Sequence, residues 1–134
     1  MECDILMVQM RLPFDWGAMS DALKRASEAR TLAIKNTPAE RRSHYGQHLT
    51  PPEVARLAVS LFSNTDTPPR CLDLGAGTGM LSVALAHRYN YQISHIDAIE
   101  LDKKLAQVLT DELNSCGMSC DVLICDALDR KSVV

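Results

Sequence analysis

The sequence lacks a long apolar run, a basic amino-terminal leader and a strong excess of either charge. No apolar stretch approaches the roughly 18 residues that a membrane-spanning helix needs. The first ten residues carry Glu2 and Asp4 but no basic start, which is not the pattern of a secretory signal peptide. A net charge of −3 argues against a free-standing nucleic-acid-binding protein. We therefore expect a cytoplasmic protein that does not associate with membranes.

Internal repeats, low-complexity tracts and paired cysteine motifs are also missing. The five cysteines are scattered along the chain, and no second pair accompanies Cys116 and Cys120 to complete a zinc site. We therefore expect free thiols and no bound metal. With 134 residues, of which 46% are hydrophobic, the chain is expected to form one globular domain at most.

The most informative segment is 70–80, which reads Arg-Cys-Leu-Asp-Leu-Gly-Ala-Gly-Thr-Gly-Met. A short apolar strand leads into a glycine-rich turn, and residues 80–88 then follow helical spacing. Glycines at such a turn permit positive φ and a close approach of ligand to backbone. Met80 replaces the third glycine of the dinucleotide fingerprint, and Asp73 could accept hydrogen bonds from an ammonium group. These features favour S-adenosylmethionine over a dinucleotide; the alternative is a turn that merely closes a strand–helix unit.

The chain resembles the class I S-adenosylmethionine-dependent methyltransferases at three expected strand ends. Asp73 to Gly79 matches their first motif, Glu100 follows about 20 residues later, and Asp126 ends a third strand. The resemblance implies that Glu100 binds the ribose hydroxyls. It implies contacts with the methionine end for Asp73, Gly75, Ala76, Gly77 and Gly79, and contacts with the adenine for Leu101, Asp126 and Leu128. Without the resemblance, Glu100 could be a surface carboxylate and Asp126 a turn residue or helix cap.

The segment that precedes the glycine turn narrows the family. Residues 45–58 resemble the Gly-Gln-Phe-Phe-Thr-Pro segment of DNA adenine-N6 methyltransferases, such as type I modification subunits and Eco57I-like enzymes. Thr50-Pro51-Pro52 is also a typical helix start, with Thr50 as the N-cap. The resemblance implies that Thr50 lies near the methionine end of the cofactor. Helical spacing predicts that an apolar stripe faces the core, formed by Val54, Leu57, Ala58 and Leu61.

These patterns predict an α/β protein with the Rossmann-like class I methyltransferase fold. We expect an incomplete parallel sheet of about three strands, near 70–74, 94–99 and 121–125, with one exposed edge. One or two helices should precede the sheet, one of them amphipathic over 20–35, and Asp102 should cap a later helix. Residues 1–45 would form a helical amino-terminal segment, and residues 46–134 a partial S-adenosylmethionine-binding domain.

A catalytic motif is missing from this pattern. The adenine-N6 enzymes carry Asn/Asp/Ser-Pro-Pro-Tyr/Phe after their fourth strand, and neither Pro51-Pro52 nor Pro68-Pro69 is followed by an aromatic residue. We therefore expect a chain truncated before the catalytic motif, with no catalytic residue of its own and little or no activity. DNA would be bound mainly through regions absent here, with Arg41 and Arg42 on a loop as candidate contacts and a specificity subunit as a possible partner.

Two alternatives stay open at this point. An rRNA adenine methyltransferase or a protein glutamine methyltransferase would share the same cofactor-binding half, and Gly46-Gln47-His48-Leu49 partly fits the rRNA enzymes. The other alternative is a non-catalytic module that binds S-adenosylmethionine or a partner subunit.

Overall fold

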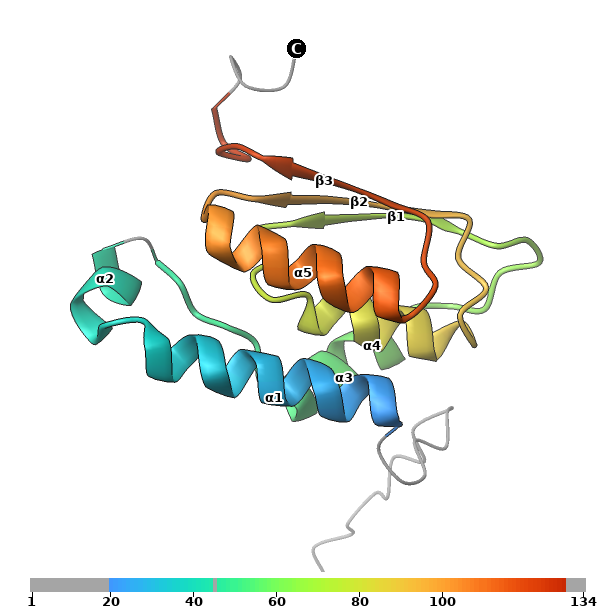
Figure 1. The fold of residues 1–134 in the computed structure, drawn as a ribbon. Coiled ribbons are helices and arrows are strands. Elements are labelled where there is room, and N and C mark those ends of the chain that lie inside the picture. Colours follow the sequence, from blue (N-terminus) through green and yellow to red (C-terminus); the bar gives the residue numbers. More distant parts are fainter. Residues whose placement is uncertain (1–19, 45, 130–134) are drawn as a thin grey trace, which may run out of the picture.

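The computed structural model describes residues 20–44 and 46–129, and its elements alternate after an all-helical start (Figure 1). Three helices come first: α1 (Asp21–Asn36), α2 (Ala39–His44) and α3 (Pro52–Ser60). Strands β1 (Arg70–Leu74), β2 (His95–Glu100) and β3 (Cys120–Ile124) then alternate with α4 (Met80–Arg88) and α5 (Lys103–Ser115). The strands form one parallel sheet in the order β1-β2-β3. The predicted α/β fold is confirmed, and each strand lies within one residue of its expected position.

The helices lie on one side of the sheet (Figure 1). On that side Ile96, Ala98 and Val122 belong to or pack against the hydrophobic core. On the other side Leu72 and Leu74 keep 62% and 59% of their surface exposed. A parallel sheet is normally covered on both faces, so this sheet has one face without a partner among the described residues, and both of its edges, β1 and β3, are unpaired there. The predicted exposed edge is thereby confirmed.

The core beneath the sheet is built from small and branched side chains. Helix α4 lies at its centre and contacts α3, α1 and α5. The fully or nearly fully buried members are Leu23, Ala26, Ala55, Val59, Val83, Ala84, Ala86, Ile96, Leu109 and Leu113. Alanines at the helix contacts let the backbones approach closely, which keeps a thin layer of helices tightly packed on the sheet. No helix in the described part of the chain is long and apolar enough to cross a bilayer.

The prediction of which side of α3 faces the core is wrong. Val54, Leu57 and Leu61 are more than half exposed, whereas α3 buries Pro52, Ala55, Val59 and Ser60. Both sets follow helical spacing, so apolar periodicity alone does not decide which set faces inward. The smaller Ala55 fits against α4 where a larger residue would hold the two helices apart.

Helix starts were predicted with mixed success. Ser20 caps α1 by accepting a hydrogen bond from the Leu23 amide, and Asp102 caps α5 through the amides of Lys104 and Leu105. Thr50 is not the N-cap of α3: Pro51 occupies that position, and no side chain caps this helix. A second correction is that three helices rather than one or two precede the sheet.

The second of these helices, α2, lies where a loop was expected. Arg41 and Arg42 lie within α2, which Ala39 and Glu40 open, with Pro38 just before it. Proline and an acid near the first turn favour a helix start, a signal that the expectation of a loop overlooked. The Arg41 guanidinium lies 3.5 Å from the Asp102 carboxylate, so α2 is tied to the start of α5.

Asp73 forms a buried polar contact between β1 and α4. Its Oδ2 accepts a hydrogen bond of 2.6 Å from the Ser82 hydroxyl. Burial raises the pKa of the Asp73 carboxyl, the Ser82 hydrogen bond partly opposes this, and the nearby Glu100 carboxylate raises the pKa further. The charged form of Asp73 is therefore disfavoured in the folded chain relative to the unfolded one.

We expect Asp73→Asn to change how stability depends on pH. Because the folded carboxyl binds its proton more tightly than the unfolded one, the contribution of Asp73 to the free energy of unfolding falls as pH rises from about 3.8 through the raised pKa. The neutral amide does not titrate, and its oxygen can still accept from Ser82. Denaturant unfolding of both proteins across this range measures the difference. Parallel pH profiles would contradict the assignment.

Gly79, at the N-cap of α4, is expected to tolerate alanine poorly. It has a φ of +88°, and a Cβ there would lie 2.7 Å from Leu109 Cδ1 in the core. Gly117→Ala is the matched control, because Gly117 has a φ of +69° and nothing within 4 Å of its Cβ position. Both variants lose about 1–2 kcal/mol to the left-handed backbone, and Gly79→Ala loses a further ~1–3 kcal/mol through overpacking. Urea unfolding measures the free energy of unfolding of both variants, and equal losses in the two would refute the packing argument.

Candidate functional site

A cavity of about 350 Å³ lies at the carboxyl ends of the three strands. Ligands of open α/β sheets bind at these strand ends, and the volume is within the range of small-molecule sites. Its walls come from the turns that follow β1, β2 and β3 and from the segment before α3. The lining residues are Gly46, Gln47, His48, Leu49, Leu74, Gly75, Gly77, Ile99, Glu100, Leu101, Leu105, Cys125, Asp126, Ala127 and Leu128.

The glycine-rich turn after β1 forms the floor of this cavity. Gly75 and Gly77 have φ values of +70° and +59°, which side-chain-bearing residues rarely adopt. The amides of Gly75 and Ala76 donate to the Ile99 carbonyl at 2.8 and 3.0 Å, which fixes the start of the turn to β2. A Cβ on Gly77 would lie 2.8 Å from Leu49 Cδ2, so glycine at this position allows the segment before α3 to lie directly on the turn.

Glu100, the last residue of β2, connects the turn to the next helix. Its Oε2 accepts a hydrogen bond of 2.7 Å from the Gly77 amide, and its Oε1 accepts one of 2.8 Å from the Asp102 amide. Only 7% of the residue is exposed, although it lines the cavity. Each carboxylate oxygen has a second lone pair, so a held Glu100 can still accept two hydrogen bonds from hydroxyl groups of a ligand.

The turn after β3 supplies the opposite wall. Asp126 Oδ1 accepts a hydrogen bond of 2.9 Å from the Leu128 amide, as in an Asx turn. This local bond agrees with the turn role considered for Asp126, and Oδ2 has no partner in the part of the chain that the structure describes. Leu101 and Leu128 are exposed, Leu128 by 91%. A polar acceptor between two exposed apolar side chains is suited to the edge and faces of a planar heterocycle.

The segment Gly46–Leu49 is held across the cavity by two side chains from other elements, Asp102 and Arg30. Gln47 Nε2 donates to Asp102 Oδ2 at 3.0 Å, and Arg30 Nε donates to the Leu49 carbonyl at 3.0 Å. Burial opposes the ionisation of Asp102, but hydrogen bonds from Gln47 and from the amides at the start of α5 hold the pKa of its carboxyl below the ordinary value. The anion that caps α5 therefore also anchors the segment before α3.

Six of the ten predicted site residues line the cavity: Gly75, Gly77, Glu100, Leu101, Asp126 and Leu128. The other four, Thr50, Asp73, Ala76 and Gly79, are not among its lining residues. Asp73 points into the helix layer toward Ser82, and Gly79 serves the contact between α4 and α5. Cofactor contacts of these four residues stay a prediction, and the geometry instead gives Asp73 and Gly79 roles in packing.

Sequence reasoning did not select Gln47, Leu49 and Leu105 as cavity residues. A signal was present for the first two, because they stand in the Gly-Gln-His-Leu-Thr segment whose position before the glycine turn had been noted. Leu105 lies on α5, one turn after the Asp102 cap, and only the direction of that helix brings it to the cavity.

No protein-family model and no curated protein matches the chain. Solved structures do match it. A proposed O-methyltransferase from Klebsiella pneumoniae is 20% identical, with a TM-score of 0.53, over 81% of this chain and 45% of that one. A proposed RNA methyltransferase from Pyrococcus horikoshii is 27% identical, with a TM-score of 0.50, over 77% of this chain and 52% of that one. The chain thus spans about half the length of these structures, and over that span it has the Rossmann-like fold of class I methyltransferases.

Proposed function

We propose that this chain is the cofactor-binding part of an S-adenosylmethionine-dependent methyltransferase that acts on N6 of adenine in DNA. The observation that carries the proposal is the Gly46–Leu49 segment, which lines the cavity and packs on the glycine turn at Gly77. In sequence this segment resembles the one that precedes the first motif of adenine-N6 enzymes. Its position in the fold agrees with a shared role at the cofactor rather than with a plain capped helix.

The residues that line the cavity fit S-adenosylmethionine. Gly75 and Gly77 would leave room for the methionine end, and Glu100 would accept hydrogen bonds from the two ribose hydroxyls through the remaining lone pairs of its held carboxylate. Asp126 would accept a hydrogen bond from the exocyclic amine of adenine, and Leu101 and Leu128 would contact the ring. The cofactor supplies a methyl group that is bonded to a sulfonium sulfur, and this sulfur is a good leaving group. The chain binds and orients this donor, and burial of Glu100 keeps water from competing for its carboxylate.

No residue of this chain acts as a covalent nucleophile or as the group that positions the target amine. The transfer is an in-line displacement at the methyl carbon, and its rate depends on positioning and on electrostatics around the amine. The Asn-Pro-Pro-Tyr-type motif that serves this purpose after base flipping is not in the sequence. We therefore assign the binding of DNA, and any specificity subunit, to other parts of the enzyme.

A second candidate is a methyltransferase that acts on RNA. The proposed RNA methyltransferase from Pyrococcus horikoshii shares 27% of aligned residues with this chain, and Gly46-Gln47-His48-Leu49 partly fits the rRNA adenine enzymes. The Thr50-Pro51-Pro52 sequence that follows favours the DNA enzymes. Both candidates use the same cavity, so they differ only in the acceptor.

We expect Glu100→Ala to weaken binding of S-adenosylmethionine and S-adenosylhomocysteine by about 100-fold or more. The variant loses two hydrogen bonds between a charged acceptor and the ribose, each worth about 1.5 kcal/mol or more. Isothermal calorimetry measures the affinities. Glu53→Ala, at an exposed position of α3, is the matched control and should bind like wild type. Circular dichroism checks the fold, because Glu100 also holds the Gly77 and Asp102 amides. A folded Glu100→Ala variant with wild-type affinity would contradict the ribose assignment.

The acceptor is tested with the complete reading frame that contains these 134 codons. We expect its product, expressed in a host without other adenine methyltransferases, to produce N6-methyladenine in host DNA, detected by mass spectrometry of digested nucleosides. An Asn-Pro-Pro-Tyr-type sequence encoded downstream should be required, and its Asn→Ala variant is the inactive control. Methylated adenine in rRNA alone would favour the second candidate. Cofactor binding without transfer to DNA, RNA or protein would identify a non-catalytic module.

A further inference from the structure

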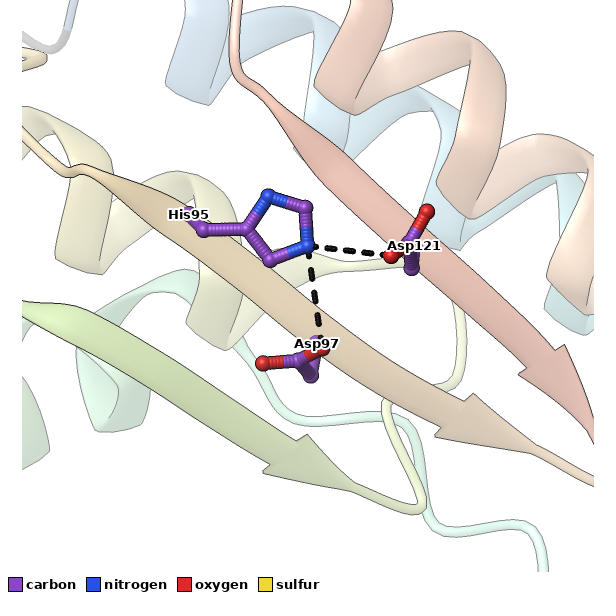
Figure 2. Close-up of side chains that lie close together, drawn as sticks. All are labelled: His95, Asp97 and Asp121. Atoms are coloured by element: carbon purple, nitrogen blue, oxygen red, sulfur yellow. Dashed lines mark ion pairs between the residues drawn. The ribbon is translucent and has the colours of Figure 1, made fainter.

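A cluster of three side chains that could bind a metal ion lies on the sheet face that none of the described helices covers (Figure 2). His95 and Asp97 alternate along β2 and therefore point to the same face, and Asp121 of β3 is the register partner of Asp97. All three belong to the amino-terminal halves of their strands, whereas the cofactor cavity lies at the carboxyl ends. The cluster is thus a separate feature, about 15 Å along β2 from Glu100 at ~3.3 Å per residue.

The distances within the cluster are those of ligands around one small cation. His95 Nε2 lies 3.3 Å from Asp121 Oδ2 and 3.6 Å from Asp97 Oδ1, and all three ligand atoms lie within 4.8 Å of one another. Zinc binds nitrogen and carboxylate oxygen at about 2.0–2.2 Å in tetrahedral geometry, which separates neighbouring ligand atoms by about 3.3–3.6 Å. Two edges of the cluster already have this length, and a rotation of the exposed Asp121 carboxylate can adjust the third.

Residues outside the cluster hold two of its members in the orientation that a metal requires. His95 Nδ1 lies 2.8 Å from the Ser119 hydroxyl, so Nε2 is the nitrogen that faces the two carboxylates. Arg70 binds Asp97 through Nε and Nη2 at 2.7 and 3.0 Å. Metal-ligating histidines commonly bond outward through the second ring nitrogen, and ligating carboxylates are themselves hydrogen-bonded. The Arg70 hydrogen bond also lowers the pKa of the Asp97 carboxyl, which keeps this ligand ionised.

We propose that His95, Asp97 and Asp121 bind a divalent transition-metal ion of the zinc type. One imidazole and two carboxylates form a ligand set that suits zinc, and water completes the coordination because the Asp121 side chain is 74% exposed. The bound ion links β2 to β3 across their register on the face that lacks helices. Its charge balances the two carboxylates, of which Asp97 also pairs with Arg70. This inference does not depend on the proposed methyltransferase function.

The test is a zinc titration of the whole chain by calorimetry, against a competing chelator. We expect one ion per chain, a melting temperature that rises with zinc concentration, and affinity at least tenfold weaker in His95→Gln and in Asp121→Asn. His44→Gln and Asp66→Asn, at exposed positions outside the cluster, are the matched controls and should bind as wild type. Cobalt spectra of each protein separate imidazole and carboxylate ligands from the four described free thiols.

A second measurement does not depend on the variants. In the wild-type protein, the ring resonances of His95 should shift on addition of zinc, while those of His44 should not. The absence of stoichiometric binding, a cobalt–thiolate spectrum, or unchanged zinc affinity in both ligand variants would overturn the proposal. In that event the three side chains form polar contacts with one another and hold no metal ion.

Discussion

The carboxylate of Glu100 is the contact on which the cavity depends. It accepts a hydrogen bond from the glycine turn after β1 and another from the residue that caps α5. Two segments, which include Gly77 and Asp102 and lie 25 residues apart along the chain, are therefore fixed to one side chain at the end of β2. The Asp102 anion extends the connection to Gln47. The turn after β1, the start of α5 and the segment before α3 thus share one hydrogen-bonded network, and removing its centre would release all three.

The strands and the glycine turn could be predicted because their signals are local. Short apolar runs end at Gly75, Glu100 and Asp126, and parallel strands bring such ends together, so six cavity residues follow from the strand assignment alone. These positions are set by backbone hydrogen bonds between neighbouring strands. The turn after β3 is the exception, because Asp126 is bonded there only to the amide of Leu128.

The features that the sequence did not predict depend on tertiary packing. Helix α3 carries two apolar stripes, and only contact with α4 selects the one that contains Ala55 and Val59. The cofactor contact of Asp73 stays a prediction, but its hydrogen bond with Ser82 on the helix side of β1 could not be read from the motif. The His95 cluster could not be predicted from the sequence, because Asp121 joins it only through strand register and lies 26 residues further along the chain than His95. The expectation that the chain holds no metal considered cysteine spacing alone.

Strand β3 forms the outer edge of the sheet, and it is bonded only to β2 among the described residues. Proteins open locally with free energies far below that of global unfolding, and such openings begin where few buried contacts hold an element. Leu123 and Ile124 are both about half exposed, so detaching β3 forfeits little buried apolar surface. This strand carries the Asp126 turn, so the third wall of the cavity can detach while the glycine turn and Glu100 stay in place. Amide hydrogen exchange at β3 would therefore report how often the cavity is complete.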